Sequence, residues 1–307
     1  KLSAIIKAEQ AGEGAEKGEA KDASPKRLKV EGIVRFKADS FTYKRFTWKP
    51  LHADISMEAG KLGIEVKKAS TMCGISTPGV INITGGEISL DFKPVAENFS
   101  VESANECLYK EQKIASGTAN LHAEIRAKGD PDKLLNSLEG SLDFSTRDGQ
   151  IYKDASALKI LNFLNFTEVF RGRFPHIGET GFHYSSGTLK GNIKEGKLKI
   201  HEGILDGDPA DIVFEGEIGL ADNDMDLTVL VAPAKTANWL IRHTPIIRRI
   251  MGGTLVTVPL KVTGPRDNLE IKTIAPDAVG GGLTGMLKRT ITMPFALFHA
   301  DPSEEKK

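Results

Sequence analysis

Histidines are the first side chains to consider for chemistry, because an imidazole can bind a metal ion or transfer a proton. No two of the seven have the spacing that places metal ligands on one face of a helix, and no HExxH or CxxC motif accompanies them. The sequence therefore predicts no metal site. The histidines are scattered at His52, His122, His176, His183, His201, His243 and His299.

Motifs for covalent or nucleotide chemistry are also missing from the sequence. It contains no GxSxG nucleophile motif and no Walker phosphate-binding loop. The stretch "GGGLTG", which begins at Gly280, formally matches GxGxxG, but it follows "TIAPDAV" rather than a strand of a βαβ unit. We interpret it as a flexible hinge before a helix. We expect no enzymatic activity and no cofactor.

The elements that would position any site are mainly β-strands. Apolar and polar residues alternate through most of the chain from residue 28 to residue 272, which indicates strands with one apolar and one solvated face. Connectors such as "EAGK", "TGGE" and "KEGK" favour hairpin turns between antiparallel neighbours. The apolar positions expected to share one face are Val34, Phe36, Ile55, Met57, Ile64, Val66, Ile81, Ile83, Leu90, Leu121, Ile125, Leu142 and Phe144.

Helical stretches are few. "DPDKLLNSL" is predicted as a short helix with Asp130 as its N-cap. Longer helices are predicted for "DASALKILNFLNFTEVF", "TANWLIRHTPIIRRIMGG" and "LTGMLKRTITMPFALFH". We expect their apolar residues either to close the sheet or to contact a membrane, in particular Leu161, Phe163, Trp239, Ile247, Leu287, Ile291 and Phe295.

The composition predicts one folded domain with a polar segment at each end. Residues 1–27 are rich in Glu, Lys, Ala and Gly, so we expect a disordered linker or insertion, with a solvated helix as the alternative. The β-domain is predicted over residues 28–300, followed by a disordered tail at 301–307. The 41 basic residues balance the 41 acidic ones, so nucleic acid is not an expected partner. The sequence shows no secretory signal and no initiator Met at its start, so we expect a fragment of a longer protein.

The predicted helices are too few to cover the predicted sheet. About thirteen strands spaced about 4.8 Å apart give one sheet face an area on the order of 1,200 Å². Three helices of about fifteen residues cover roughly 700 Å² of it. The sheet must then curl onto itself, pack as a closed sandwich or barrel, or bind something apolar.

Several stretches together resemble one protein family. They are "STMCGISTPGVINITGGEISL", "GSLDFSTRDGQIYKDASALKILNFLNFTE", "GFHYSSGTLKGNIKEGKLKIHEGILDG", "VLVAPAKTANWLIRHTPIIRRIMGGTLVTVPLKVTG" and "AVGGGLTGMLKRTITMPFAL". In this order they resemble the C-terminal region of AsmA-like proteins, over about Leu62 to Leu297. The anchor and most of the groove typical of that family would lie outside this sequence.

The resemblance implies a long antiparallel sheet curled into a U-shaped apolar groove and closed by short helices. The function it implies is the distal segment of a periplasmic bridge, which carries phospholipids from the inner to the outer membrane by shielding their acyl chains. An inner-membrane anchor would precede this segment, and an outer-membrane or envelope protein is a possible partner. The alternative is a closed β-sandwich that scaffolds envelope assembly or secretion through its edge strands, without lipid.

Two expectations depend on that compartment and that groove. In an oxidising compartment Cys73 and Cys107 are expected to form a disulfide, and two buried free thiols are the alternative. The segment from Leu283 to Phe298 has an apolar stripe beside Lys288 and Arg289. It is expected either to contact a membrane or to pack as a lid over the last strands.

Overall fold

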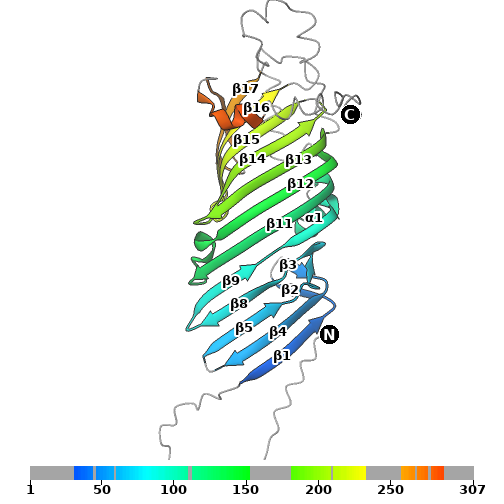
Figure 1. The fold of residues 1–307 in the computed structure, drawn as a ribbon, viewed down its shortest axis with the longest axis vertical. Helices are drawn as coiled ribbons and strands as arrows, with labels where there is room; N and C mark the ends of the chain where they lie inside the picture. The colour runs from blue at the N-terminus through cyan, green and yellow to red at the C-terminus, as the bar shows by residue number, and fades with distance from the viewer. Residues whose placement is uncertain are drawn as a thin grey trace, which may run out of the picture.

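The computed structural model of the chain is one large antiparallel β-sheet with few helices. It describes residues 31–43, 46–58, 60–109, 113–152, 181–208, 210–232, 257–266, 268–275 and 278–286. Figure 1 shows the strands stacked one above another along the long axis, from β1 at one end to β17 at the other. The mainly β architecture predicted from alternation is therefore confirmed, because each alternating stretch pairs with a neighbour.

The first half of the described chain consists mostly of short strands. They are β1 (Gly32–Ala38), β2 (Phe41–Tyr43), β3 (Phe46–Trp48), β4 (Leu51–Glu58), β5 (Lys61–Val66), β6 (Thr71–Met72), β7 (Ile75–Ser76), β8 (Gly79–Thr84), β9 (Glu87–Phe92) and β10 (Val95–Ser100), followed by helix α1 (Val101–Tyr109).

The second half has longer strands. They are β11 (Ala115–Gly129), β12 (Glu139–Ile151), β13 (Phe182–Lys194), β14 (Lys197–Gly207), β15 (Asp211–Gly219), β16 (Asp224–Ala232), β17 (Val258–Pro265) and β18 (Glu270–Thr273), with a 3-10 helix η1 (Leu134–Ser137) between β11 and β12.

Strand pairing gives the sheet a main ladder and a side ladder. The main ladder runs in the order β1, β4, β5, β8, β9, β11, β12, β13, β14, β15, β16, β17 and β18. The side ladder starts where β10 pairs with β11, and continues through β7, β6 and β3 to β2. Every pair is antiparallel.

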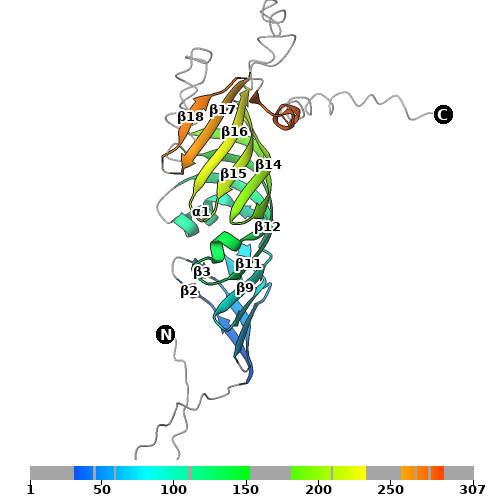
Figure 2. The same cartoon turned by 90° about the vertical axis from the view of Figure 1, so that its left-hand side faces the viewer.

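Three prolines separate the two ladders. Pro50 lies between β3 and β4, Pro78 between β7 and β8, and Pro94 between β9 and β10. Their carbonyl oxygens still accept backbone hydrogen bonds of 2.9 to 3.1 Å, but a proline has no N–H to donate, so strand pairing is interrupted there. The side ladder therefore departs from the main one. Figure 2 shows β2 and β3 displaced toward the side on which α1 lies.

The core lies under the C-terminal strands. The side chains of Phe182, Leu260 and Val262 are fully buried in one apolar cluster that spans β13 to β17. A second cluster lies on the opposite face of β15 and β16, where Val213 packs against Leu283. Both faces of this end of the sheet therefore carry buried apolar residues.

The helices differ from the predicted ones in two places. The stretch 130–138 forms only η1, a 3-10 helix, and Lys133 rather than Asp130 occupies its N-cap position. Helix α1 was not predicted, although Ser100 caps it by accepting a hydrogen bond from the backbone N–H of Ser103 at 3.1 Å. The helices predicted within 154–170 and 236–253 lie outside the described residues.

Candidate functional site

One face of the N-terminal strands carries a continuous apolar surface, which we call the apolar face. In its central row, Val34 lies opposite Ile55, Ile55 opposite Ile64, and Ile64 opposite Ile81, which lies opposite Leu90. Residues directly opposite in an antiparallel pair point to the same side of a sheet. The row therefore crosses five strands without a polar interruption.

Further rows widen the apolar face and extend it. Leu90 lies opposite Ala127 of β11, and alternation along β11 places Leu121 and Ile125 on the same side. Leu121 in turn lies opposite Phe144 of β12. By the same pairings, Phe36, Met57, Val66, Ile83 and Leu142 belong to this face as well. The strand pairings thus bring together all the apolar positions that alternation predicted to share one face.

Most of the apolar face is only partly covered. The side chain of Val34 is 49 % exposed, whereas that of Val66 is 8 % exposed. Ile64, Ile81 and Leu121 have intermediate exposure. Several apolar residues of the C-terminal strands, in contrast, are fully buried, among them Val213, Leu260 and Val262. The apolar face is therefore a half-covered surface, which soluble proteins rarely leave over several strands unless it binds something.

The opposite face of the same strands is charged. Asp54 accepts ion pairs from Lys67 Nζ at 3.0 Å and from Arg35 Nε at 3.4 Å, and Lys67 also pairs with Glu65 at 2.7 Å. The hydrogen bond from Lys67, together with the charge of Arg35, holds the pKa of Asp54 below its usual value. This face is adapted to water.

An apolar cavity of about 650 Å³ lies beside the C-terminal strands, and we call it the C-terminal cavity. Phe144 belongs both to its lining and to the apolar face, so the two surfaces meet at β12. Leu189, Phe214 and Leu227 also line it, and Leu269 closes it from the turn between β17 and β18. Because β12 and this turn line one cavity, the sheet must be curved here.

Tyr184 supplies the main polar contact inside the C-terminal cavity. Its hydroxyl donates to the carbonyl oxygen of Ser116 at 2.6 Å and lies 3.1 Å from the hydroxyl of Thr146. Burial raises the pKa of Tyr184, and the Thr146 contact partly offsets this. The hydroxyl thus ties β11, β12 and β13 together. Alternation could not predict this contact, because it joins residues 68 positions apart.

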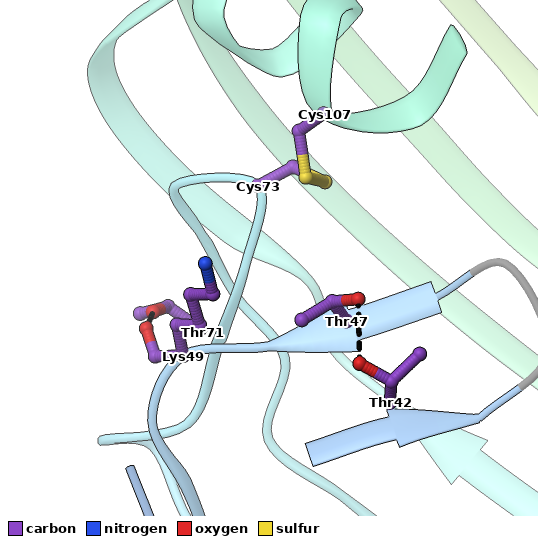
Figure 3. Close-up of a disulfide and its surroundings, with 6 residues drawn as sticks. All are labelled: Thr42, Thr47, Lys49, Thr71, Cys73 and Cys107. Carbon is purple, nitrogen blue, oxygen red and sulfur yellow. Dashed lines mark hydrogen bonds between the residues drawn. A yellow bond between two sulfur atoms is a disulfide. The ribbon is translucent and has the colours of Figure 1, made fainter. Parts of the chain in front are cut away.

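A disulfide holds the side ladder against α1. Cys73, in the turn between β6 and β7, is bonded to Cys107 of α1, with their Cα atoms 5.5 Å apart (Figure 3). The expected pairing is therefore present. Within the same region the hydroxyls of Thr42 and Thr47 lie 2.9 Å apart across the hairpin of β2 and β3.

The hairpin of β2 and β3 reaches the apolar face through aromatic rings. The ring centroids of Phe36, on the apolar face, and Phe41, in β2, are 6.0 Å apart in an edge-to-face arrangement. Trp48 lies next to Phe41, and its Nε1 donates to the hydroxyl of Thr77 at 3.1 Å. The side ladder and α1 therefore flank the apolar face on one side.

The predicted C-terminal helix starts on the other side of the sheet. Residues 281–286 are helical, and Leu283 and Met286 are buried against Val213, Leu230 and Ala232. Leu230 and Ala232 alternate along β16 with Leu227 and Val229, which line the C-terminal cavity. The helix therefore packs on the face of the sheet that is turned away from the cavity. Figure 2 agrees, because the short red helix and α1 lie on opposite sides of the sheet. The described part of this helix therefore packs over the last strands but does not close the cavity.

The remaining predicted contact residues lie outside the described part of the chain. These are Leu161, Phe163, Trp239, Ile247, Leu287, Ile291 and Phe295. Within the described residues, no group of three or more His, Cys, Asp or Glu side chains has a geometry that could hold a metal ion. No helix in the described ranges is long and apolar enough to cross a membrane.

Comparisons with known proteins give no match. No family model matches the sequence, and no curated protein or solved structure is significantly similar to it. The apolar face and the C-terminal cavity are therefore the basis for a functional assignment.

Proposed function

We propose that this chain is a segment of a phospholipid-carrying bridge, in which the apolar face and the C-terminal cavity shield acyl chains from water. The observation that carries the proposal is the continuity of the apolar surface. It runs from Val34 at β1 to Phe144 at β12 and enters the cavity there. Polar and charged side chains occupy the opposite face of the same strands.

The energetics of acyl chains suit such a surface. Each methylene group removed from water contributes about 0.8 kcal/mol, without any directional contact. A moving chain can therefore exchange one set of aliphatic neighbours for the next at little cost, provided that the apolar surface has no gap. A catalytic residue is not needed for this function.

We further propose that the sheet is curled into a U-shaped groove. The lining of the C-terminal cavity supports it, because residues of β12 and of the turn after β17 face one space. The side ladder and α1 would form one wall of the groove, and the disulfide would hold that wall in place. The sheet would then be curled along its whole length, as in the AsmA-like proteins that the sequence resembles.

The proposed location is the periplasm, with an inner-membrane anchor and an outer-membrane or envelope partner. The bonded Cys73 and Cys107 support an oxidising compartment. Phospholipid is the cargo in this proposal, and no cofactor takes part.

Mass spectrometry of organic extracts tests the proposal. The protein is purified without detergent, and a matched soluble protein is carried through the same steps. We expect phospholipid in the extract of this protein alone. Lipid-free protein from several expression conditions, together with no uptake of a fluorescent lipid, would contradict the proposal.

A scaffold role is the second candidate, and the outer edge of β1 favours it. Among the described residues β1 pairs only with β4, and the side chain of Ile33 is 75 % exposed. An unpaired edge can accept a strand from another protein. Under this alternative the apolar face would be covered by protein, and extracts would contain no lipid.

A further inference from the structure

The outer edge of β1 is open to another strand. Among the described residues, β1 and β18 end the main ladder, and each pairs on one side only. β18 has four residues, whereas β1 has seven, contains no proline and pairs with β4 without a register shift. The charged side chains of β1, Arg35 and Lys37, lie on one face only. The edge of β1 therefore lacks most of the features with which proteins prevent strand pairing.

Both faces of β1 leave apolar side chains uncovered at this edge. Ile33, on the charged face, is 75 % exposed, and Val34, on the apolar face, is 49 % exposed. Ile55, which lies opposite Val34 on β4, is less exposed because strands flank it on both sides. A strand that covers the edge must therefore offer apolar side chains at two consecutive positions, one for each face.

The stretch "LSAIIKAE" at residues 2–9 has this pattern. Its even positions are apolar, and its odd positions are polar apart from Ile5. Period two is typical of a strand, and the consecutive Ala4, Ile5 and Ile6 supply apolar side chains to both faces. Residues 10–28 follow, and a connection of this length lets the stretch return antiparallel to β1 at a modest entropic cost.

One antiparallel register fits both faces. With Ile5 opposite Ile33, the exposed Ile33 gains an apolar neighbour on the charged face, and Ala4 lies opposite Val34 on the apolar face. Directly opposite residues share a face, so the even positions of the stretch all fall on the apolar face. The apolar row that starts at Val34 then begins one strand earlier, at Ala4.

The charges of the stretch fit the same register. It places Lys7 opposite Glu31 and Glu9 opposite Lys29, which gives two pairs of opposite charge. Glu31 is exposed, and no ion pair joins it to another described residue. A slip by two residues in either direction would instead put Glu9 opposite Glu31 or Lys7 opposite Lys29. Like charges directly opposite each other destabilise paired strands, so the charges select this register.

We infer that residues 2–9 dock on the outer edge of β1 as an antiparallel strand, with Ile5 opposite Ile33. The single pair of like charges, Lys1 with Lys37, lies just beyond the docked residues. The disordered linker that composition predicts is then confined to the connection after the docked strand. Docking occupies the edge that a scaffold would offer to a partner, and it extends the apolar face by one strand. It requires no lipid, so the inference goes beyond the proposed function.

Engineered disulfides test the register in the full chain. Ile5→Cys with Ile33→Cys places two thiols at directly opposite positions, within reach of a disulfide. Ile6→Cys with Ile33→Cys is the matched control, because its two thiols point to opposite faces. After mild oxidation and proteolysis, linked peptides are quantified by mass spectrometry. We expect about tenfold more linked peptide from the first pair than from the second. Equal yields, no link in the first pair, or a link between two molecules would overturn the inference.

Hydrogen exchange tests the docking without engineered cysteines. Exchange of the backbone amides is compared between the unmodified chain and a chain that lacks residues 1–9. We expect the β1 amides that are not bonded to β4 to exchange about tenfold faster after the deletion, and the amides of β18 to be unchanged. Equal exchange of the β1 amides in the two chains would overturn the docking. Neither measurement involves lipid, so either failure leaves the proposed function standing.

Discussion

Leu121 of β11 and Phe144 of β12 lie directly opposite each other, at the point where the apolar face meets the C-terminal cavity. A chain that passes from one surface to the other must cross this pair. Both residues are aliphatic or aromatic and only half-buried, so their side chains offer contact to a ligand as well as to the protein.

A charge at this junction should block lipid uptake. In Leu121→Asp, a carboxylate must lose water whenever an acyl chain lies over it, so uptake of a fluorescent phospholipid should fall at least severalfold. His122→Asp is the control, because the neighbouring side chain is exposed and points to the opposite face. Uptake that is equal in the two folded variants would contradict the proposed path.

The disulfide should contribute substantially to stability. Cys73 and Cys107 are 34 positions apart, and closing a loop of that length stabilises the fold by about 4 kcal/mol in the chain-entropy model. The double replacement by Ser should lower the free energy of unfolding by a value up to that size, measured by chemical denaturation. Thiol labelling of unfolded, unreduced protein should detect no free thiol, and two reactive thiols would refute the bond.

Packing of Tyr184 against Gly149 makes a second stability prediction. A Cβ on Gly149 would lie 2.3 Å from the Tyr184 hydroxyl oxygen and 2.2 Å from the carbonyl oxygen of Ser116, which is backbone and cannot move aside. We expect Gly149→Ala to cost more than about 2 kcal/mol of unfolding free energy.

The matched control for that glycine is Gly285, within the helix at 281–286. A Cβ there meets nothing within 4 Å, so Gly285→Ala should be neutral or stabilise the helix by up to about 1 kcal/mol. If the two replacements have equal effects on the denaturation midpoint, the close approach of Tyr184 is wrong.

Asp206 and Asp211 should make stability depend on pH. They lie opposite each other at the end of the β14–β15 hairpin, and burial together with the charge of Asp206 raises the pKa of Asp211 to about 7. The folded state then binds more protons than the unfolded state between about pH 4 and pH 7, so stability falls as the pH rises through that window.

Replacing the carboxyl group should remove this pH effect. Asp211→Asn should raise the denaturation midpoint more at pH 8 than at pH 5, because the carboxylate that is costly to bury is then gone. Asp208→Asn, at the exposed hairpin, should behave like the unmodified protein. An equal gain for Asp211→Asn at both pH values would contradict the raised pKa of Asp211.

Alternation predicted the apolar face well because the pairings from β1 to β9 contain no register shift that would turn a side chain to the other face. Ile55, Ile64 and Ile81 were placed on one side by period alone, and the pairings of β4 with β5 and of β5 with β8 keep them on that side. The pairing of Cys73 with Cys107 followed from there being only two cysteines and from the expected compartment.

Features that depend on contacts between distant parts of the chain could not be predicted from the sequence. The interruptions of strand pairing at Pro50, Pro78 and Pro94 separate the two ladders only because the strands beside them pair, and those pairings join distant parts of the chain. Helix α1 is nine residues long and only weakly amphipathic in its sequence, so its Ser100 cap was the only signal. Which side of the sheet would receive Leu283 and Met286 could not be deduced from an apolar stripe, because both sides of β16 are apolar there.

Photo-crosslinking from individual positions tests the central claim most directly. A photoreactive amino acid is placed at Ile64 or Leu121 on the apolar face, and at Glu65 or His122 on the opposite face, in cells whose phospholipids are radiolabelled. The account predicts labelled protein after irradiation at Ile64 and Leu121 and none at Glu65 and His122. Equal labelling from both faces, or labelling from neither, would contradict the claim that the apolar face carries acyl chains.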